Sequence, residues 1–213
     1  MDKILRKIRN EAKLILLNKK NSHNWDHTER VLNLGLHLAE KEKADTFIVA
    51  VACLLHDIGR FKEDNSNGKI NHAIYGARLA KKILLKYKIK EEIIEKIVHC
   101  IKSHRFRGNI KPETKEAKCL FDADKLDSIG AVGIGRAFLF AGEVGAKLHN
   151  KVKNINKTRP YTSEDTAYRE YIIKLRHIKN KMLTKEGNRL AKDRDFFMKK
   201  FFMRFNKEIK GAI

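Results

Sequence analysis

The stretch ACLLHDIGRF (residues 52–61) places a histidine and an aspartate, His56 and Asp57, at the end of an apolar run. Such a run is expected to be buried, and a buried aspartate is costly unless it is paired or binds a cation. Adjacent side chains at a helix end differ in direction by about 100°, yet both can reach one ion that lies beyond the last turn. The pair therefore predicts a buried helix that ends at a metal ion.

Length and composition favour one compact all-α domain. The chain has 213 residues, 42% of them hydrophobic, with only two prolines and 34% charged residues, a composition that suits long helices. Three widely spaced cysteines form no disulfide pattern, which indicates a reducing compartment. The N-terminal segment has charges among its apolar residues, and no run approaches the roughly 18 apolar residues of a membrane span. We expect a cytoplasmic protein without a membrane partner.

Apolar residues at helical spacing predict a series of helices separated by polar breaks. The domain is expected to span 1–213, with 20–149 forming the helical core and 164–209 packing on it. The breaks fall at 62–69, 105–113 and 150–164. The predicted helices are 2–19, 25–43, 45–58, 72–88, 90–104, 114–128, 131–149, 164–181 and 185–209.

Helical spacing also turns several polar side chains toward apolar faces. His99 instead falls on a polar face, and Asp122 lies roughly opposite the apolar face of its helix. One inward histidine is more often a hydrogen-bonded core residue than a metal ligand. Several on different helices, together with buried aspartates, favour a cation in the interior. The side chains turned inward in this way are His27, His72, His104 and Asp124.

The order of these residues resembles the HD-domain superfamily of metal-dependent phosphohydrolases: a histidine, a distant His-Asp pair and a more distant aspartate. Here His27 is followed by HDIGR at 56–60 and DADKLD at 122–127. The flanking sequences DHTERV, NHAIYGARLA, KSHRF, DADKLDSIGAVGIGRAF and LAKDRDFFMKKFF are similar to the predicted HD-superfamily hydrolases of bacteria and archaea. The resemblance covers roughly residues 20–205. It implies a compact multi-helix HD-domain bundle with the metal site in its core.

The resemblance also implies a set of metal ligands. Asp124 is chosen among the aspartates of DADKLD because it follows the alanine, as in the family motif, and because helical spacing turns it inward. Dinuclear branches of the superfamily add histidines between the pair and the last aspartate, where His72 and His104 stand. These two would then hold a second metal, with substrate binding by His72 as the alternative. The implied ligands of the first metal are His27, His56, Asp57 and Asp124.

Imidazole and carboxylate ligands suit Mn²⁺, Fe²⁺, Co²⁺ or Ni²⁺, with Zn²⁺ and Mg²⁺ as further alternatives. A bound ion makes water easier to deprotonate and offsets charge on a phosphoryl oxygen, so the implied reaction is phosphoester hydrolysis. Asp57 or His72 is a candidate to accept the proton of water, and His104 to orient the phosphate. Arg60 stands where many HD proteins have lysine, and it is a candidate catalytic and substrate-binding cation.

Three further residues have both a functional and a structural interpretation. Lys125 could offset the charge of a substrate, although surface solvation is the commoner role of a lysine. Arg30 and Asp127 could orient metal ligands, or each could be half of a structural ion pair. The sequence does not decide between these interpretations.

The expected substrate is a small phosphorylated molecule such as a nucleotide. The formal net charge of +21 predicts weak, salt-dependent, non-specific binding of nucleic acid. Two alternatives stay open: a phosphodiesterase that acts on nucleic acid or an oligonucleotide, and a non-catalytic, metal-stabilised binding protein. The sequence gives no oligomeric state.

Overall fold

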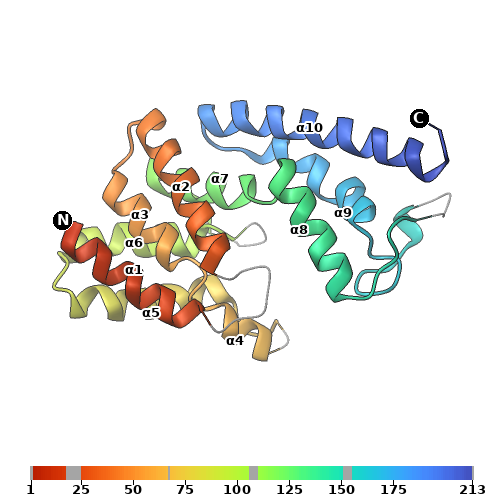
Figure 1. Ribbon diagram of the computed structural model, residues 1–213. Coiled ribbons are helices and arrows are strands. Elements are labelled where there is room, and N and C mark those ends of the chain that lie inside the picture. Colours follow the sequence, from red (N-terminus) through yellow and green to blue (C-terminus); the bar gives the residue numbers. More distant parts are fainter. Residues whose placement is uncertain (1, 18–24, 67, 106–109, 151–154, 213) are drawn as a thin grey trace. The chain divides into compact units, whose positions relative to one another are not determined.

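The computed structural model describes residues 2–17, 25–66, 68–105, 110–150 and 155–212 (Figure 1). Within these ranges all regular secondary structure is helical, so the predicted all-α fold is confirmed. None of the described helices combines the length and apolar content of a membrane span. The α-helices are α1 (Asp2–Leu16), α2 (Trp25–Glu42), α3 (Thr46–Leu55), α4 (Arg60–Asn65), α5 (His72–Lys86), α6 (Glu91–Ser103), α7 (Lys115–Leu126), α8 (Gly130–Glu143), α9 (Ala167–Ile173) and α10 (Lys185–Ile209).

The chain folds into two compact units, Met1–Asp124 and Lys125–Ile213. The first unit contains α1 to α6 and most of α7, and the second contains α8 to α10 with the 3₁₀ helices η1 (Ile155–Lys157) and η2 (Leu175–Lys181). The sequence predicts a single domain in which residues 164–209 pack on the helical core. That statement involves both units, and it stays a prediction.

Helix α3 lies at the centre of the first unit, where it packs against α1, α2, α5 and α6. Its residues from Val49 to Leu55 are at most 1% exposed, as expected of an apolar helix with neighbours on several sides. The Asp45 side chain caps its N-terminus by accepting hydrogen bonds from the backbone N of Phe47 (2.9 Å) and Ile48 (3.1 Å). The helix ends at Leu55, so the apolar run delivers His56 into the interior.

Two glycines allow α5 to approach the turn that follows α3. A Cβ atom on Gly59 would collide with the carbonyl oxygen of His72 and would lie 2.6 Å from the backbone N of Gly76. Backbone therefore packs directly on backbone at this point, which only glycine permits. The contact brings the first turn of α5 next to the HDIGR turn.

Three predicted elements differ from the structure. Helix α4 lies partly within the predicted break 62–69, where an ion pair between Arg60 and Glu63, three residues apart, supports it. The predicted helix 164–181 is interrupted at Lys174, whose φ of −128° leaves helical geometry, and continues as η2. The predicted helix 131–149 ends at Glu143, and Gly145 adopts a φ of +66°, as is common after a helix end.

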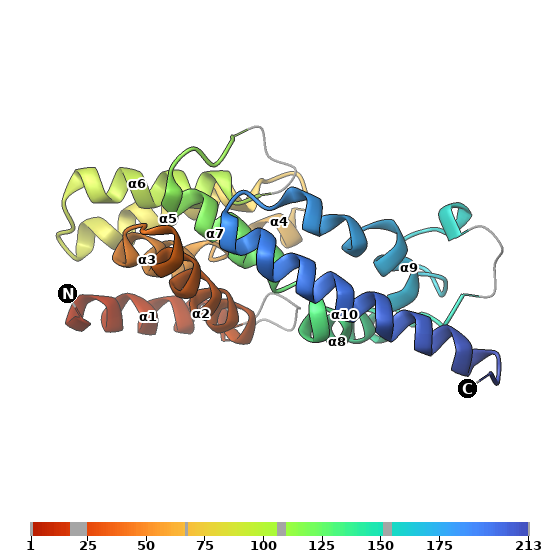
Figure 2. The ribbon, with the colours of Figure 1, turned by 90° about the horizontal axis from the view of Figure 1, so that it is seen from above.

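The second unit has a core rich in aromatic residues. Helix α10 packs on α8 and η2 (Figure 2), and the Thr184 side chain caps it by accepting a hydrogen bond from the backbone N of Gly187 (3.0 Å). The ring of Phe202, which is 1% exposed, stacks on Tyr171 with 4.4 Å between ring centroids. Such stacking adds to the stabilisation that burial provides.

Candidate metal centre

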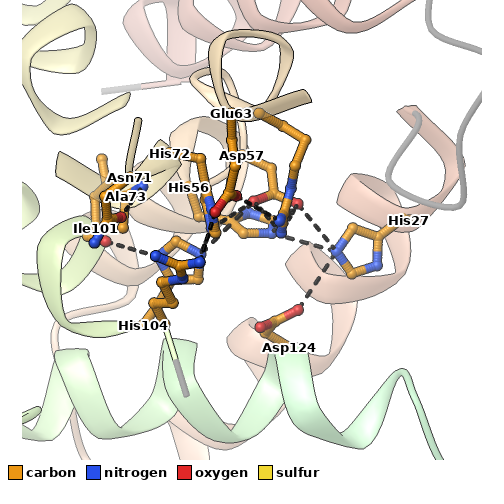
Figure 3. Close-up of polar contacts among 12 residues, drawn as sticks. His27, His56, Asp57, Glu63, Asn71, His72, Ala73, Ile101, His104 and Asp124 are labelled. Atoms are coloured by element: carbon orange, nitrogen blue, oxygen red, sulfur yellow. Dashed lines mark hydrogen bonds and ion pairs between the residues drawn. The ribbon is translucent and has the colours of Figure 1, made fainter. Parts of the chain in front are cut away.

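The inward side chains predicted from the sequence meet in the interior of the first unit (Figure 3). His56 and Asp57 directly follow α3, and His104 directly follows α6. These three side chains therefore follow the ends of two helices. The other inward side chains are His27 in the first turn of α2, His72 at the start of α5 and Asp124 in α7. All are buried except Asp124, whose side chain is 17% exposed.

One group of donor atoms forms around His27 and His56. Their Nε2 atoms lie 3.3 Å apart, and Oδ1 of Asp124 lies 3.5 Å from Nε2 of His27. One ligand atom from each of these three residues lies within 4.8 Å of the others. Oδ2 of Asp57 adds a fourth donor, 3.6 Å from Nε2 of His56.

A second group forms on the other oxygen of the same aspartate. Oδ1 of Asp57 lies 3.5 Å from Nε2 of His72 and 3.7 Å from Nε2 of His104. The two Nε2 atoms are themselves 3.2 Å apart. The buried carboxylate of Asp57 therefore lies between two pairs of imidazoles, with one oxygen toward each.

The outer ring nitrogens fix the tautomers of these histidines. Nδ1 of His56 donates to the carbonyl of Cys53 (2.7 Å), and Nδ1 of His104 donates to the carbonyl of Ile101 (2.6 Å). A carbonyl oxygen can only accept, so Nδ1 carries the proton and Nε2 of the neutral ring keeps its lone pair. Nδ1 of His72 donates to the carboxylate of Glu63. In metal sites such outer hydrogen bonds orient the imidazole ligands.

This arrangement fits a divalent cation. Burial lowers the pKa of His56 to about 4 and also lowers the pKa of His72, so both rings are neutral at neutral pH. Nitrogen lone pairs and carboxylate oxygens then face one another in a buried space, where such contacts repel. A cation converts these atoms into ligands. Mixed imidazole and carboxylate donors suit the transition metals favoured from the sequence.

The residues predicted to bind substrate or to orient metal ligands differ in their burial and in their ion pairs. The guanidinium of Arg60 contacts Asp57 (Nη2 to Oδ1, 3.2 Å) and Glu63 (Nη1 to Oε2, 3.0 Å). Arg30 is half-buried in α2, and Lys125 is half-buried in α7. Asp127 forms a 2.6 Å ion pair with Arg136 within the second unit. The functional roles of these residues stay predictions.

Glu63 and Arg105 belong to the site but were not predicted from the sequence. Glu63 is 8% exposed and lies in the polar run KEDN, where no pattern distinguishes it from its neighbours. Arg105 follows His104 and donates to Oε1 of Glu63 (2.6 Å). In the sequence, only the position of Arg105 directly after the inward histidine His104 pointed to a place in the site.

Two expectations about helix faces have different outcomes. Asp122 was expected to face away from the apolar side of its helix, but it is fully buried, because Cys119, Leu120 and Ala123 are buried as well and α7 is covered around most of its circumference. His99 is half-buried and accepts a hydrogen bond from the backbone N of Glu113 (3.3 Å). It is not part of either donor group.

Comparison with known proteins supports the resemblance seen in the sequence. A family model described as the HD domain matches residues 24–129, a range that contains every donor described above. YpgQ of Bacillus subtilis is 35% identical over 208 residues, which cover 96% of this chain and 93% of YpgQ. The chain belongs to the HD domain family. It is thus a metal-dependent hydrolase in general terms.

Solved structures agree with this assignment. The crystal structure of YpgQ has a TM-score of 0.77 at 31% identity and covers 98% of this chain and 97% of its own, and YpgQ has also been solved in complex with ADP. An HD-superfamily hydrolase from Bacillus thuringiensis has a TM-score of 0.77 at 27% identity, with 98% of both chains covered. Ribonuclease Y of Borreliella afzelii is 32% identical over 123 residues, which are 58% of this chain but only 22% of ribonuclease Y.

Proposed function

We propose that this HD-family protein is a phosphohydrolase that hydrolyses a phosphoester of a nucleotide or another small molecule. The observation that carries the proposal is the approach of imidazole Nε2 atoms to both oxygens of one buried carboxylate, that of Asp57. The complex of YpgQ with ADP supports a nucleotide as the substrate class.

The first donor group is proposed to hold the catalytic ion. Two imidazoles and two carboxylates suit Mn²⁺, Fe²⁺, Co²⁺ or Ni²⁺, with Zn²⁺ and Mg²⁺ as alternatives. An ion bound there would lower the pKa of water and neutralise charge on a phosphoryl oxygen. The residues that would hold it are His27, His56, Asp57 and Asp124.

His72 is proposed to take a proton from the attacking water. Its Nδ1 donates to Glu63, so its Nε2 has the lone pair that a general base requires. The carboxylate of Glu63 then stabilises the positive charge on the ring. His104 presents Nε2 beside it and can orient the phosphate. The alternative is that these two histidines and Asp57 hold a second ion, which needs the same tautomers.

Cationic side chains are proposed to offset the charge of the phosphate. Arg60 and Arg105 are both partly exposed, with 22% and 29% of their side chains accessible. Both already contact Glu63, so their guanidinium groups are held in place before a substrate arrives. Lys125 is a third candidate.

The proposal is tested on protein purified without added metal. Elemental analysis identifies the bound ions, and a panel of nucleotides, sugar phosphates and generic phosphomonoesters and phosphodiesters is assayed with each candidate metal. Metal-dependent hydrolysis of at least one of these phosphoesters, lost in Asp124→Ala, is the expected result. Metal binding without turnover on any substrate would instead favour the non-catalytic binding protein.

A nucleic-acid phosphodiesterase is the second candidate. The similarity to part of ribonuclease Y and the net charge of +21 favour it. Metal-dependent cleavage of RNA or DNA at physiological salt, lost in Asp124→Ala, would replace the first proposal by this one.

A further inference from the structure

We infer that Glu63 is a positioning residue that fixes the ring of His72 and ties together the three segments that carry Asp57, His72 and His104. The inference rests on the proposed function for its catalytic consequence. Its structural part is that Glu63 fixes the tautomer of the His72 ring, which can be tested on the folded protein without a substrate.

Both oxygens of the Glu63 carboxylate are used. Oε2 accepts from Nδ1 of His72 and from Nη1 of Arg60 (3.0 Å). Oε1 accepts from Nη2 of Arg105 (2.6 Å). A buried carboxylate of this kind is stable only when it is paired and hydrogen-bonded. The two arginines provide that pairing, so the carboxylate is available to orient the histidine.

Each arginine is also linked to a donor of the metal centre. Arg60 contacts Oδ1 of Asp57 through Nη2 (3.2 Å), and Arg105 is the residue after His104. Glu63 thus joins the turn after α3, the start of α5 and the end of α6. These are the segments from which the donors around Oδ1 of Asp57 come.

The tautomer of His72 explains why this connection matters. With Nδ1–H donating to Glu63, Nε2 presents a lone pair toward Oδ1 of Asp57 and Nε2 of His104. Without the carboxylate, the ring is free to carry its proton on Nε2 and to place a donor where a base or a ligand is needed. Both uses proposed for His72 fail in that tautomer.

The test compares three full-length variants. Glu63→Ala removes the acceptor, and Glu63→Gln keeps an oxygen that can accept from Nδ1. Asp64→Ala is the matched control, because it removes a negative charge from the next residue of α4, which is exposed. The readouts are the ring tautomer of His72 by ¹⁵N NMR of metal-free protein, Mn²⁺ affinity by calorimetry, and turnover.

Glu63→Ala should lose the Nδ1–H tautomer, and Mn²⁺ affinity or turnover should fall by about 10- to 100-fold, as for other residues that orient ligands. Glu63→Gln should keep the tautomer and most of the affinity, and Asp64→Ala should match the wild type. His72 in the Nδ1–H form in Glu63→Ala, or in the Nε2–H form in the wild type, would overturn the inference. If Glu63→Ala does not fold, the tautomer of His72 in the wild-type protein still tests the inference. A tautomer change in a protein without metal binding or turnover would support the positioning role and reject the proposed function.

Discussion

Nε2 of His56 lies 3.3 Å from Nε2 of His27 in the interior of the first unit. The proton of the His56 ring is on Nδ1, which donates to a backbone carbonyl, so Nε2 of His56 offers a lone pair. Oδ2 of Asp57 also offers lone pairs to both rings, at 3.6 Å from Nε2 of His56 and 3.9 Å from Nε2 of His27. Acceptors that converge in a buried space repel unless a cation lies among them.

Removal of metal should therefore destabilise the protein. A ligand that binds only the folded state stabilises it by about 2.7 kcal/mol when its free concentration is 100 times its Kd. Urea unfolding with a chelator should show a lower free energy of unfolding than unfolding with Mn²⁺. Asp124→Ala, which lacks one donor, is the control and should respond much less. Coinciding wild-type curves with and without metal would argue against the site.

Alanine substitution of three histidines should distinguish the two that belong to the donor groups from His99, which does not. His72 and His104 are at most 3% exposed and present Nε2 atoms toward Asp57, whereas His99 contacts the backbone of Glu113. His72→Ala and His104→Ala should lower turnover by about 10²-fold or more, as expected for loss of a base or ligand, and His99→Ala should have little effect. Steady-state assays at saturating metal make the comparison. A larger loss in His99→Ala than in the other two would reject this arrangement.

Gly59→Ala should destabilise the first unit, because its Cβ would collide with the carbonyl oxygen of His72. Forced overpacking of this kind typically costs about 1–3 kcal/mol. Gly135→Ala in α8 is the matched control: outside its own stretch of helix, its Cβ would have no atom within 4 Å, and alanine should stabilise the helix by roughly 0.5–1 kcal/mol. Chemical denaturation measures both variants. Wild-type stability in Gly59→Ala would show that the close approach of α5 is not required.

Nucleic-acid binding should be weak and should fall steeply with salt. It rests on the +21 net charge and hence on counterion release, whereas hydrolysis of a small substrate depends on the metal and a few nearby cations. Binding of single- and double-stranded DNA and RNA is measured at low and physiological salt, with hydrolysis assayed in parallel. Tight binding that survives physiological salt would contradict the small-molecule assignment.

The sequence predicted the features that depend on local pattern. The apolar run before His56 predicted the central helix, and helical spacing placed His27, His72 and His104 in the interior. Asp122 shows where this reasoning fails, because a helix covered on several sides buries residues outside its main apolar stripe. The contact between Glu63 and Arg105 joins residues 42 positions apart. Contacts of that kind follow from how the helices pack, which no local pattern encodes.

Asp57 provides the most direct test of the metal centre, because its two oxygens face both donor groups. The measurement is metal content together with turnover on the best phosphorylated substrate, for the wild type and Asp57→Asn purified in parallel. Asp64→Asn, the same change at an exposed residue of α4, is the control. We predict that Asp57→Asn loses bound metal and turnover together while Asp64→Asn keeps both. Full metal content with unchanged turnover in Asp57→Asn would contradict the assignment of this site.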